Sequence, residues 1–188
     1  MFTIVVCIKF LIMKSTVYRY GIYAMLAMVL LSAVHVFLVV PNVKSANAEV
    51  VGYLTMLLSM IFVFAGIKHY RDKINNGTLS FWQGLKIGML IVLIPSIAFG
   101  LFDLLYTKVI NPGWMENYYK EMIEHTKKVT VPDKLDAALR KLESSKEIFS
   151  NPFLEFLLMA VTVFIIGFIV TIISSLALRR SRSASALT

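Results

Sequence analysis

Four long, mostly apolar stretches constrain the fold of this 188-residue chain more than any other feature. They cover about residues 18–40, 50–67, 81–106 and 152–178. A bilayer core about 30 Å thick takes roughly 20 apolar residues in a helix, because only a helix or a closed barrel satisfies every backbone group there. The sequence therefore predicts an all-α, polytopic membrane protein with four transmembrane helices in a single membrane domain over residues 1–188.

Composition agrees with a bilayer environment. Hydrophobic residues make up 58% of the chain and charged residues only 16%, whereas soluble domains average roughly 45–50% and 25%. The net charge of +8 lies in basic residues that flank the apolar stretches, as the positive-inside rule places them. We therefore expect the lipid bilayer as a partner and no nucleic acid.

Local signals mark the helix ends. Ser80 and Gln83 have the spacing of a capping box before the third stretch. Asn151 is the expected N-cap of the fourth, with Pro152 at the first helical position. Pro95, in the middle of the third stretch, predicts a kink because it removes one backbone hydrogen bond.

The distribution of Lys and Arg predicts the orientation, because basic residues resist translocation. The amino-terminal flank, the second connection and the tail carry Lys9, Lys14, Arg19, Lys68, Arg71, Lys73, Lys86, Arg179, Arg180 and Arg182. The first connection carries only Lys44. We expect a protein of the bacterial inner membrane with both termini and the segment 68–80 in the cytoplasm, which places the segment 108–150 outside.

That outer segment contains two stretches with helical apolar spacing within residues 111–150. The stripes consist of Met115, Tyr118, Tyr119, Met122 and Ile123, and of Leu135, Ala138, Leu139 and Leu142. Asp133, after Pro132, is the expected N-cap of the second helix. The sequence predicts an extracytoplasmic helical hairpin. Its stripes either pack on each other and on the spans, or place Trp114, Tyr118 and Tyr119 in the lipid headgroups.

Three ionisable residues in the apolar stretches are candidate site residues: His35, Asp103 and Glu155. In the predicted topology all three lie toward the outer ends of their helices, where a polar cluster could relay protons or bind a cation. Each also has a structural interpretation. Glu155 lies in a first helical turn near water, Asp103 could pair with Lys108, and His35 could bond a neighbouring helix.

Small residues suggest close helix packing. Gly84 and Gly88 form a GxxxG pattern in the third stretch, and Gly167, Thr171 and Ser175 form a stripe on the fourth. Packing within the chain is the first interpretation and homodimerisation the second.

No catalytic motif is present in the sequence: it lacks a Walker loop, HExxH and GxSxG. Cys7 is the single cysteine, and the three histidines His35, His69 and His125 lie on separate segments. We therefore expect no catalytic residues, no metal site, no cofactor and no enzymatic activity.

Residues 1–12 form an apolar stretch that is too short to span a membrane and lacks a signal-peptide cleavage site. Met13, directly before the first span, is an alternative start to Met1, which would make residues 1–12 a misassigned extension.

The second connection is the most distinctive stretch: residues 66–81 read GIKHYRDKINNGTLSF, followed by Gly84 and Gly88. Asn76 and Gly77 tolerate the positive φ of a tight turn. This stretch, with the segments 111–118 and 151–153, resembles a family of small four-span bacterial membrane proteins, the domain of unknown function four-one-nine-nine. The resemblance covers about residues 15–180 and implies no activity, substrate or site residue. Asp103 is not a feature of the resemblance, which weakens its case as a site.

The sequence favours a non-enzymatic accessory or scaffold protein acting through its basic cytoplasmic segment and its outer loop, with another membrane protein or a second copy as partner. The alternative is an oligomeric small transporter or channel subunit, motivated by Pro95 and the three ionisable residues. A membrane enzyme comes third.

Overall fold

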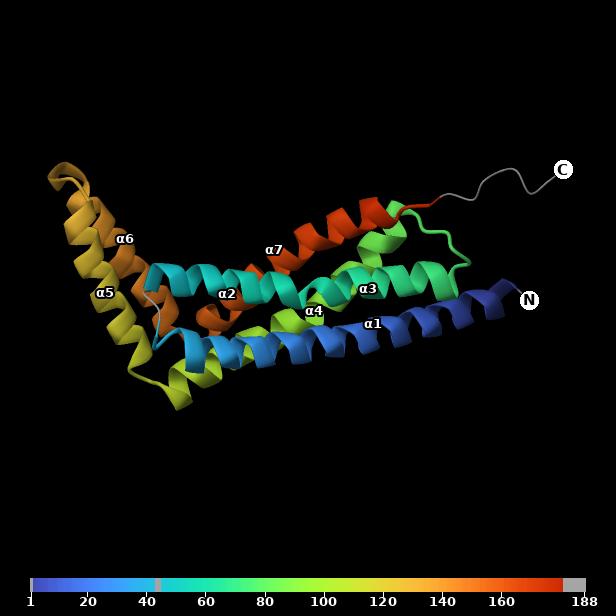
Figure 1. Ribbon diagram of the computed structural model, residues 1–188, viewed down its shortest axis with the longest axis horizontal. Helices are drawn as coiled ribbons and strands as arrows, with labels where there is room; N and C mark the ends of the chain where they lie inside the picture. The colour runs from blue at the N-terminus through green and yellow to red at the C-terminus, as the bar shows by residue number, and fades with distance from the viewer. Residues whose placement is uncertain (1, 43–44, 181–188) are drawn as a thin grey trace. The chain divides into compact units, whose positions relative to one another are not determined.

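The computed structural model of the protein describes residues 2–42 and 45–180, nearly all of them helical (Figure 1). Met1, Lys44 and Arg182 lie outside the described residues. The α-helices are α1 (Phe2–Val34), α2 (Ser45–Ser59), α3 (Ile61–His69), α4 (Phe81–Leu105), α5 (Trp114–Val129), α6 (Pro132–Ser150) and α7 (Pro152–Leu178). The described ranges contain no strand, only one isolated antiparallel bridge between Leu79 and Arg180.

Four helical segments are long and apolar enough to cross a membrane, as the sequence predicts. They run over Met13–Val39, Asn47–Ile74, Phe81–Ile110 and Pro152–Leu178. The second continues to Ile74, past the expected end at residue 67. Apolar residues predict only the part of a helix that lies in hydrocarbon. The helix can extend further, because long basic side chains carry their charged ends into water. The basic residues Lys68, Arg71 and Lys73 are therefore helical.

π-Helical turns end the first three of these segments: η1 (His35–Val39), η2 (Tyr70–Ile74) and η3 (Tyr106–Ile110). In each, the N–H group after the turn donates to the carbonyl of its first residue, at 3.0, 2.9 and 2.8 Å. Such turns are rare and short, and apolar spacing does not predict them.

The second apolar segment is divided between α2 and α3 at Met60. Two hydroxyls bond back to the helix just before the break, Thr55 Oγ1 to Gly52 O at 2.7 Å and Ser59 Oγ to Thr55 O at 2.8 Å. Side-chain bonds of this kind compete with the helical ladder and often bend helices. The division is therefore a local effect of Thr55 and Ser59.

Two of the predicted caps form and one does not. The Ser80 amide donates to Gln83 Oε1 at 3.1 Å and the Gln83 amide donates to Ser80 Oγ at 3.2 Å, which is the predicted capping box. Asn151 Oδ1 accepts from the Phe153 amide at 3.0 Å. The prediction of Asp133 as an N-cap is wrong: α6 begins at Pro132, because proline has no N–H to lose at the first position, and the cap falls on Val131.

The helix α4 continues through Pro95. The kink predicted there stays a prediction.

The chain divides into two compact units, residues 1–99 with 161–188, and residues 100–160. In the first unit, α1 lies along α2 and α3 (Figure 1). Its core is mostly apolar, with Met28, Val63, Ile67, Ile91 and Val163 fully buried, and it also contains hydroxyl side chains such as Ser59 and Thr171. Large apolar side chains such as Leu30, Leu57 and Ile173 are more than half exposed. The unit is thus apolar inside and outside, as a lipid-facing bundle must be.

Small residues bring α4 and α7 together in the first unit. A Cβ atom on Gly84 would lie 2.8 Å from Oγ of Ser175, and one on Gly88 would overlap Thr171. A Cβ atom on Gly167 would overlap Val92. The GxxxG pattern of α4 and the small stripe of α7 therefore contact each other within the chain, where no side chain separates the two backbones.

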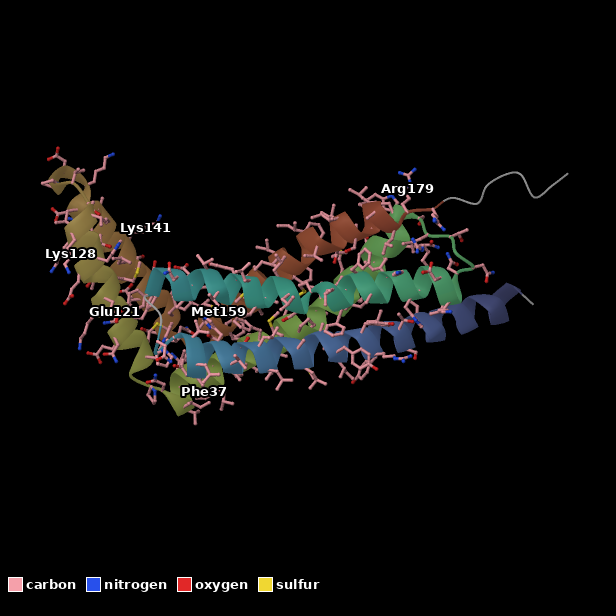
Figure 2. The ribbon with its side chains drawn as sticks, in the orientation of Figure 1. Phe37, Glu121, Lys128, Lys141, Met159 and Arg179 are labelled. Carbon is pink, nitrogen blue, oxygen red and sulfur yellow. The ribbon has the colours of Figure 1, made fainter. Side chains whose placement is uncertain are left out.

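The second unit contains α5 and α6, which pack on one another. The apolar stripes of both helices are buried or half-buried, and Tyr119 is only 4% exposed. The Trp114 and Tyr118 rings stack with centroids 5.2 Å apart. Burial raises the pKa of the Tyr119 phenol. Charged side chains such as Glu121, Lys128 and Lys141 project from the outer faces (Figure 2).

We predict that Gly88→Ala destabilises the protein. Helix propensity alone would stabilise the variant by about 1 kcal/mol, but the added methyl overlaps Thr171, and overpacking costs about 1–3 kcal/mol. Unfolding in detergent followed by circular dichroism measures the sign. Gly113→Ala is the control because nothing lies within 4 Å of its Cβ position. Stabilisation of Gly88→Ala would contradict the close contact.

Candidate functional site

Glu155 is the most deeply buried ionisable side chain in the apolar helices, with 0% exposure. It lies in the first turns of α7, within the second unit. Its Oε1 atom accepts a hydrogen bond from Thr107 Oγ1 at 2.7 Å. Its Oε2 atom lies 2.8 Å from Nζ of Lys108, outside hydrogen-bond geometry but as a close ion pair. The negative charge of this buried carboxylate is therefore stabilised by Thr107 and Lys108, at the end of the third apolar segment.

Lys108 connects this pair to a third helix of the same unit. Its side chain is 36% exposed, and Nζ also donates to the Phe149 carbonyl, near the end of α6, at 3.3 Å. The last carbonyls of a helix carry partial negative charge, which favours a cation there. One ammonium group thus links the ends of the third apolar segment, α6 and α7.

Asp103 lies one turn before this pair on α4 and is half-buried. Its backbone carbonyl accepts a second bond from Thr107 Oγ1 at 3.0 Å. Asp103 and Glu155 therefore belong to one polar cluster, which we define as Asp103, Thr107, Lys108 and Glu155.

His35 belongs to the first unit and has a different partner. Its Nε2 atom lies 2.8 Å from the Ala48 carbonyl of α2, and a Cβ atom on Gly52 would lie 3.3 Å from its ring. His35 thus joins the end of the first apolar segment to the start of the second, as its structural interpretation requires.

The structure places two of these side chains differently from their sequence interpretations. Lys108, a possible partner of Asp103 in the sequence interpretation, forms its ion pair with Glu155. The expectation that Glu155 lies near water is wrong: its side chain is fully enclosed by protein, because α7 turns it toward Thr107 and Lys108 of η3. Thr107 was missed as a site residue; its position four residues after Asp103, on the same helix face, is a signal that could have found it.

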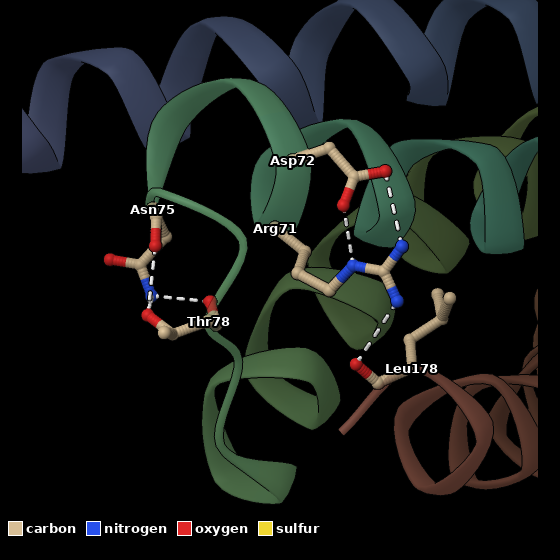
Figure 3. Close-up of polar contacts among 5 residues, drawn as sticks. All are labelled: Arg71, Asp72, Asn75, Thr78 and Leu178. Atoms are coloured by element: carbon tan, nitrogen blue, oxygen red, sulfur yellow. Dashed lines mark hydrogen bonds and ion pairs between the residues drawn. The ribbon is translucent and has the colours of Figure 1, made fainter. Parts of the chain in front are cut away.

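The opposite ends of the helices carry a second polar arrangement, in the first unit (Figure 3). Arg71 forms two bonds to the Asp72 carboxylate, from Nε at 2.6 Å and from Nη2 at 3.1 Å. Its Nη1 atom also donates to the Leu178 carbonyl, the last of α7, at 3.5 Å. Arg71 therefore covers an unpaired helix-end carbonyl, as basic residues do at helix C-termini.

A tight turn follows at residues 75–78. Asn76 and Gly77 have φ of 50° and 75°, the positive values predicted from the Asn-Gly pair. The Asn75 side chain donates to the Thr78 carbonyl at 2.7 Å (Figure 3). The backbones of Leu79 and Arg180 then exchange two hydrogen bonds, at 2.9 and 3.0 Å. The turn before α4 is thus attached to the end of α7.

We predict that Lys108→Met destabilises the protein more than Glu155→Gln. The first change leaves a buried carboxylate without its cation, at a cost of about 2–3 kcal/mol given the partial exposure of Lys108. The second change removes the charge and keeps an acceptor for Thr107. Chemical unfolding in detergent measures both, and the double variant reports their coupling.

The matched control is Lys120→Met. Lys120 pairs with Glu116 at 3.1 Å, but both side chains are about two thirds exposed, so its loss should cost no more than about 0.5 kcal/mol. Equal effects of Lys108→Met and Lys120→Met would contradict the importance of the buried pair.

Within the residues that the structure describes, no group of three or more His, Cys, Asp or Glu side chains could hold a metal ion. Neither a curated protein nor a solved structure matches the chain. A family model described as "Protein of unknown function (DUF4199)" matches residues 19–180. This match covers all four apolar helices except the first residues of the first, and it agrees with the resemblance of the segment 66–81. The chain belongs to the DUF4199 family.

Proposed function

We propose that this protein is a non-enzymatic accessory or scaffold protein of the bacterial inner membrane, which binds another membrane component through α5 and α6. The observation that carries the proposal is the difference between the two faces of this helix pair. Its apolar stripes are buried or half-buried, while its outer faces are charged and exposed.

Those outer faces carry both signs of charge. The helices α5 and α6 contain seven basic and seven acidic residues. Most of them are exposed, and hydrogen bonding by Lys120 holds the pKa of Glu116 below its ordinary value. A mixed, ordered surface of this kind favours a protein partner, because complementary charge pairs fix the register of an interface. A lipid surface would favour one sign.

The proposal includes an orientation with both termini in the cytoplasm and α5 and α6 outside. The support comes from the basic residues of the first unit. The end of α3 with η2, the start of α4 and the end of α7 lie together (Figure 1), and they carry Lys68, Arg71, Lys73, Lys86, Arg179 and Arg180. Arg19 of α1 precedes Tyr20, whose ring contacts His69 at the end of α3. Positive charge concentrates on the cytoplasmic side of membrane proteins.

Single cysteines test the orientation and the partner together, in a Cys7→Ser background. A membrane-impermeant maleimide applied to intact spheroplasts should label Lys128→Cys, on the exposed face of α5, and leave Lys73→Cys unlabelled until the membrane is opened. The reverse pattern would exclude the orientation. Both positions are exposed in the protein, so differences in labelling report the side of the membrane.

An impermeant thiol-to-amine crosslinker at Lys128→Cys should then produce a discrete adduct, identified by mass spectrometry. Lys141→Cys on α6 is the second site and should give the same partner. If both positions are labelled by maleimide but neither yields an adduct in native membranes, the accessory role loses its support.

An oligomeric small transporter or channel subunit is the second candidate, and the Thr107 hydroxyl that bonds both Asp103 and Glu155 favours it. Polar carboxyl groups in apolar helices commonly mark ion pathways. We expect no ion or proton flux in reconstituted liposomes, because Thr107 and Lys108 already occupy both oxygens of Glu155. Flux that falls in Asp103→Asn and in Glu155→Gln would reverse the order of the two candidates.

A further inference from the structure

A pocket lies between the start of α4 and the end of α7, in the first unit. Its volume is about 840 Å³, which is within the range of about 300–1,000 Å³ typical of ligand sites. The lining combines donors with apolar surface and includes Asn76, Phe81, Trp82, Leu176, Arg179 and Arg180. None of these residues belongs to the polar cluster around Glu155.

The charge of the pocket is positive. Neither Arg179 nor Arg180 belongs to the ion pairs Arg71–Asp72, Lys108–Glu155 and Lys120–Glu116 of the described part of the chain. Asp72, the acidic residue of the adjacent segment, has both carboxylate oxygens bound by Arg71. Two guanidinium groups, which suit the oxygens of a phosphate, therefore line one pocket.

The walls of the pocket are held by backbone bonds. The exchange between Leu79 and Arg180 ties the two sides together, and the Asn75–Thr78 bond closes the adjacent turn (Figure 3). A site formed in advance loses less free energy on binding than one that must be ordered. Because these bonds use main-chain atoms of Arg180, its side chain can be changed without removing them.

The pocket lies at the limits of two apolar segments, which begin at Phe81 and end at Leu178. Trp82 is 68% exposed and Leu176 is 57% exposed. Both line the pocket together with Arg179 and Arg180, so apolar surface lies beside the two arginines. Figure 2 labels Arg179 at the end of α7. Tryptophan is enriched at the headgroup level of membranes. The occupant should therefore have an anionic head and an apolar body.

We infer that this pocket binds the headgroup of an anionic phospholipid, with Arg179 and Arg180 contacting the phosphate and Trp82 and Leu176 contacting the acyl-chain region. A free phosphate would use the same guanidinium groups. Only a lipid would also contact the apolar surface beside them. The pocket lies at the limits of the apolar helices, where lipid headgroups are expected.

Native mass spectrometry of the full chain in a neutral detergent tests the site. Dioleoyl-phosphatidylglycerol is titrated against the wild type, with dioleoyl-phosphatidylcholine as the zwitterionic comparison. The site variant is Arg179→Gln with Arg180→Gln, and the matched control is Arg140→Gln with Lys141→Gln on α6. Each pair removes two positive charges from exposed positions, and circular dichroism checks that both fold.

We expect phosphatidylglycerol to bind the wild type more tightly than phosphatidylcholine. The site variant should bind phosphatidylglycerol on the order of tenfold more weakly, because each basic residue contributes to attraction of anionic lipids. The control should stay within about twofold of the wild type. Arg179→Lys with Arg180→Lys should recover part of the binding, since charge is kept and the bidentate geometry is lost.

Three results would overturn the inference. Equal loss in the site variant and the α6 control would assign the binding to diffuse charge. Equal affinity for the two lipids would remove the role of the phosphate-facing arginines. Displacement of phosphatidylglycerol by millimolar inorganic phosphate, without any contribution from the acyl chains, would assign the pocket to a soluble anion.

Discussion

Backbone amides in hydrocarbon have no water to bond with, and the rest of the structure depends on this constraint. It makes each apolar stretch helical, and it also explains how the helices end and break. In the π-helical turns that end three segments, carbonyls near the helix end accept a bond from the N–H group after the turn. At the Met60 break, the Met60 and Val63 amides bond to Leu57 and Met60 at 3.1 and 3.0 Å. At the π-helical turns and at the Met60 break, the backbone groups named here therefore stay paired.

The same constraint governs polar side chains inside the apolar helices. Ser96 and Thr171 each bond the carbonyl one turn back, at 2.8 Å. His35 bonds a carbonyl of the next helix, and Glu155 has both a hydroxyl and an ammonium partner. Ser96 and Thr171 bond within their own helices, whereas His35 and Glu155 connect neighbouring segments. A polar group that is already hydrogen-bonded or ion-paired stabilises the contact between two segments and is less available as a ligand for a transported ion. The polar cluster therefore supports the proposed accessory role better than a transport role.

The ends of the helices hold the features that distinguish this chain from any four apolar helices. At one end of the first unit, arginines and main-chain bonds join the turn before α4 to the last residues of α7. In the second unit, α5 and α6 pack through apolar stripes and expose charge. Membrane proteins that act through partners place recognition outside the hydrocarbon, where charged groups are inexpensive to keep. Both arrangements follow that rule.

Sequence alone determined the four apolar helices, the capping box at Ser80 and the Asn76–Gly77 turn, because each depends on residues within a few positions of one another. It did not determine that Glu155 pairs with Lys108 and Thr107, which are 47 and 48 residues away in the chain. It also could not place Arg180 beside Leu79. Those contacts depend on how each helix is rotated and offset against its neighbours, and only side-chain packing between distant segments, such as Gly88 against Thr171, decides that geometry.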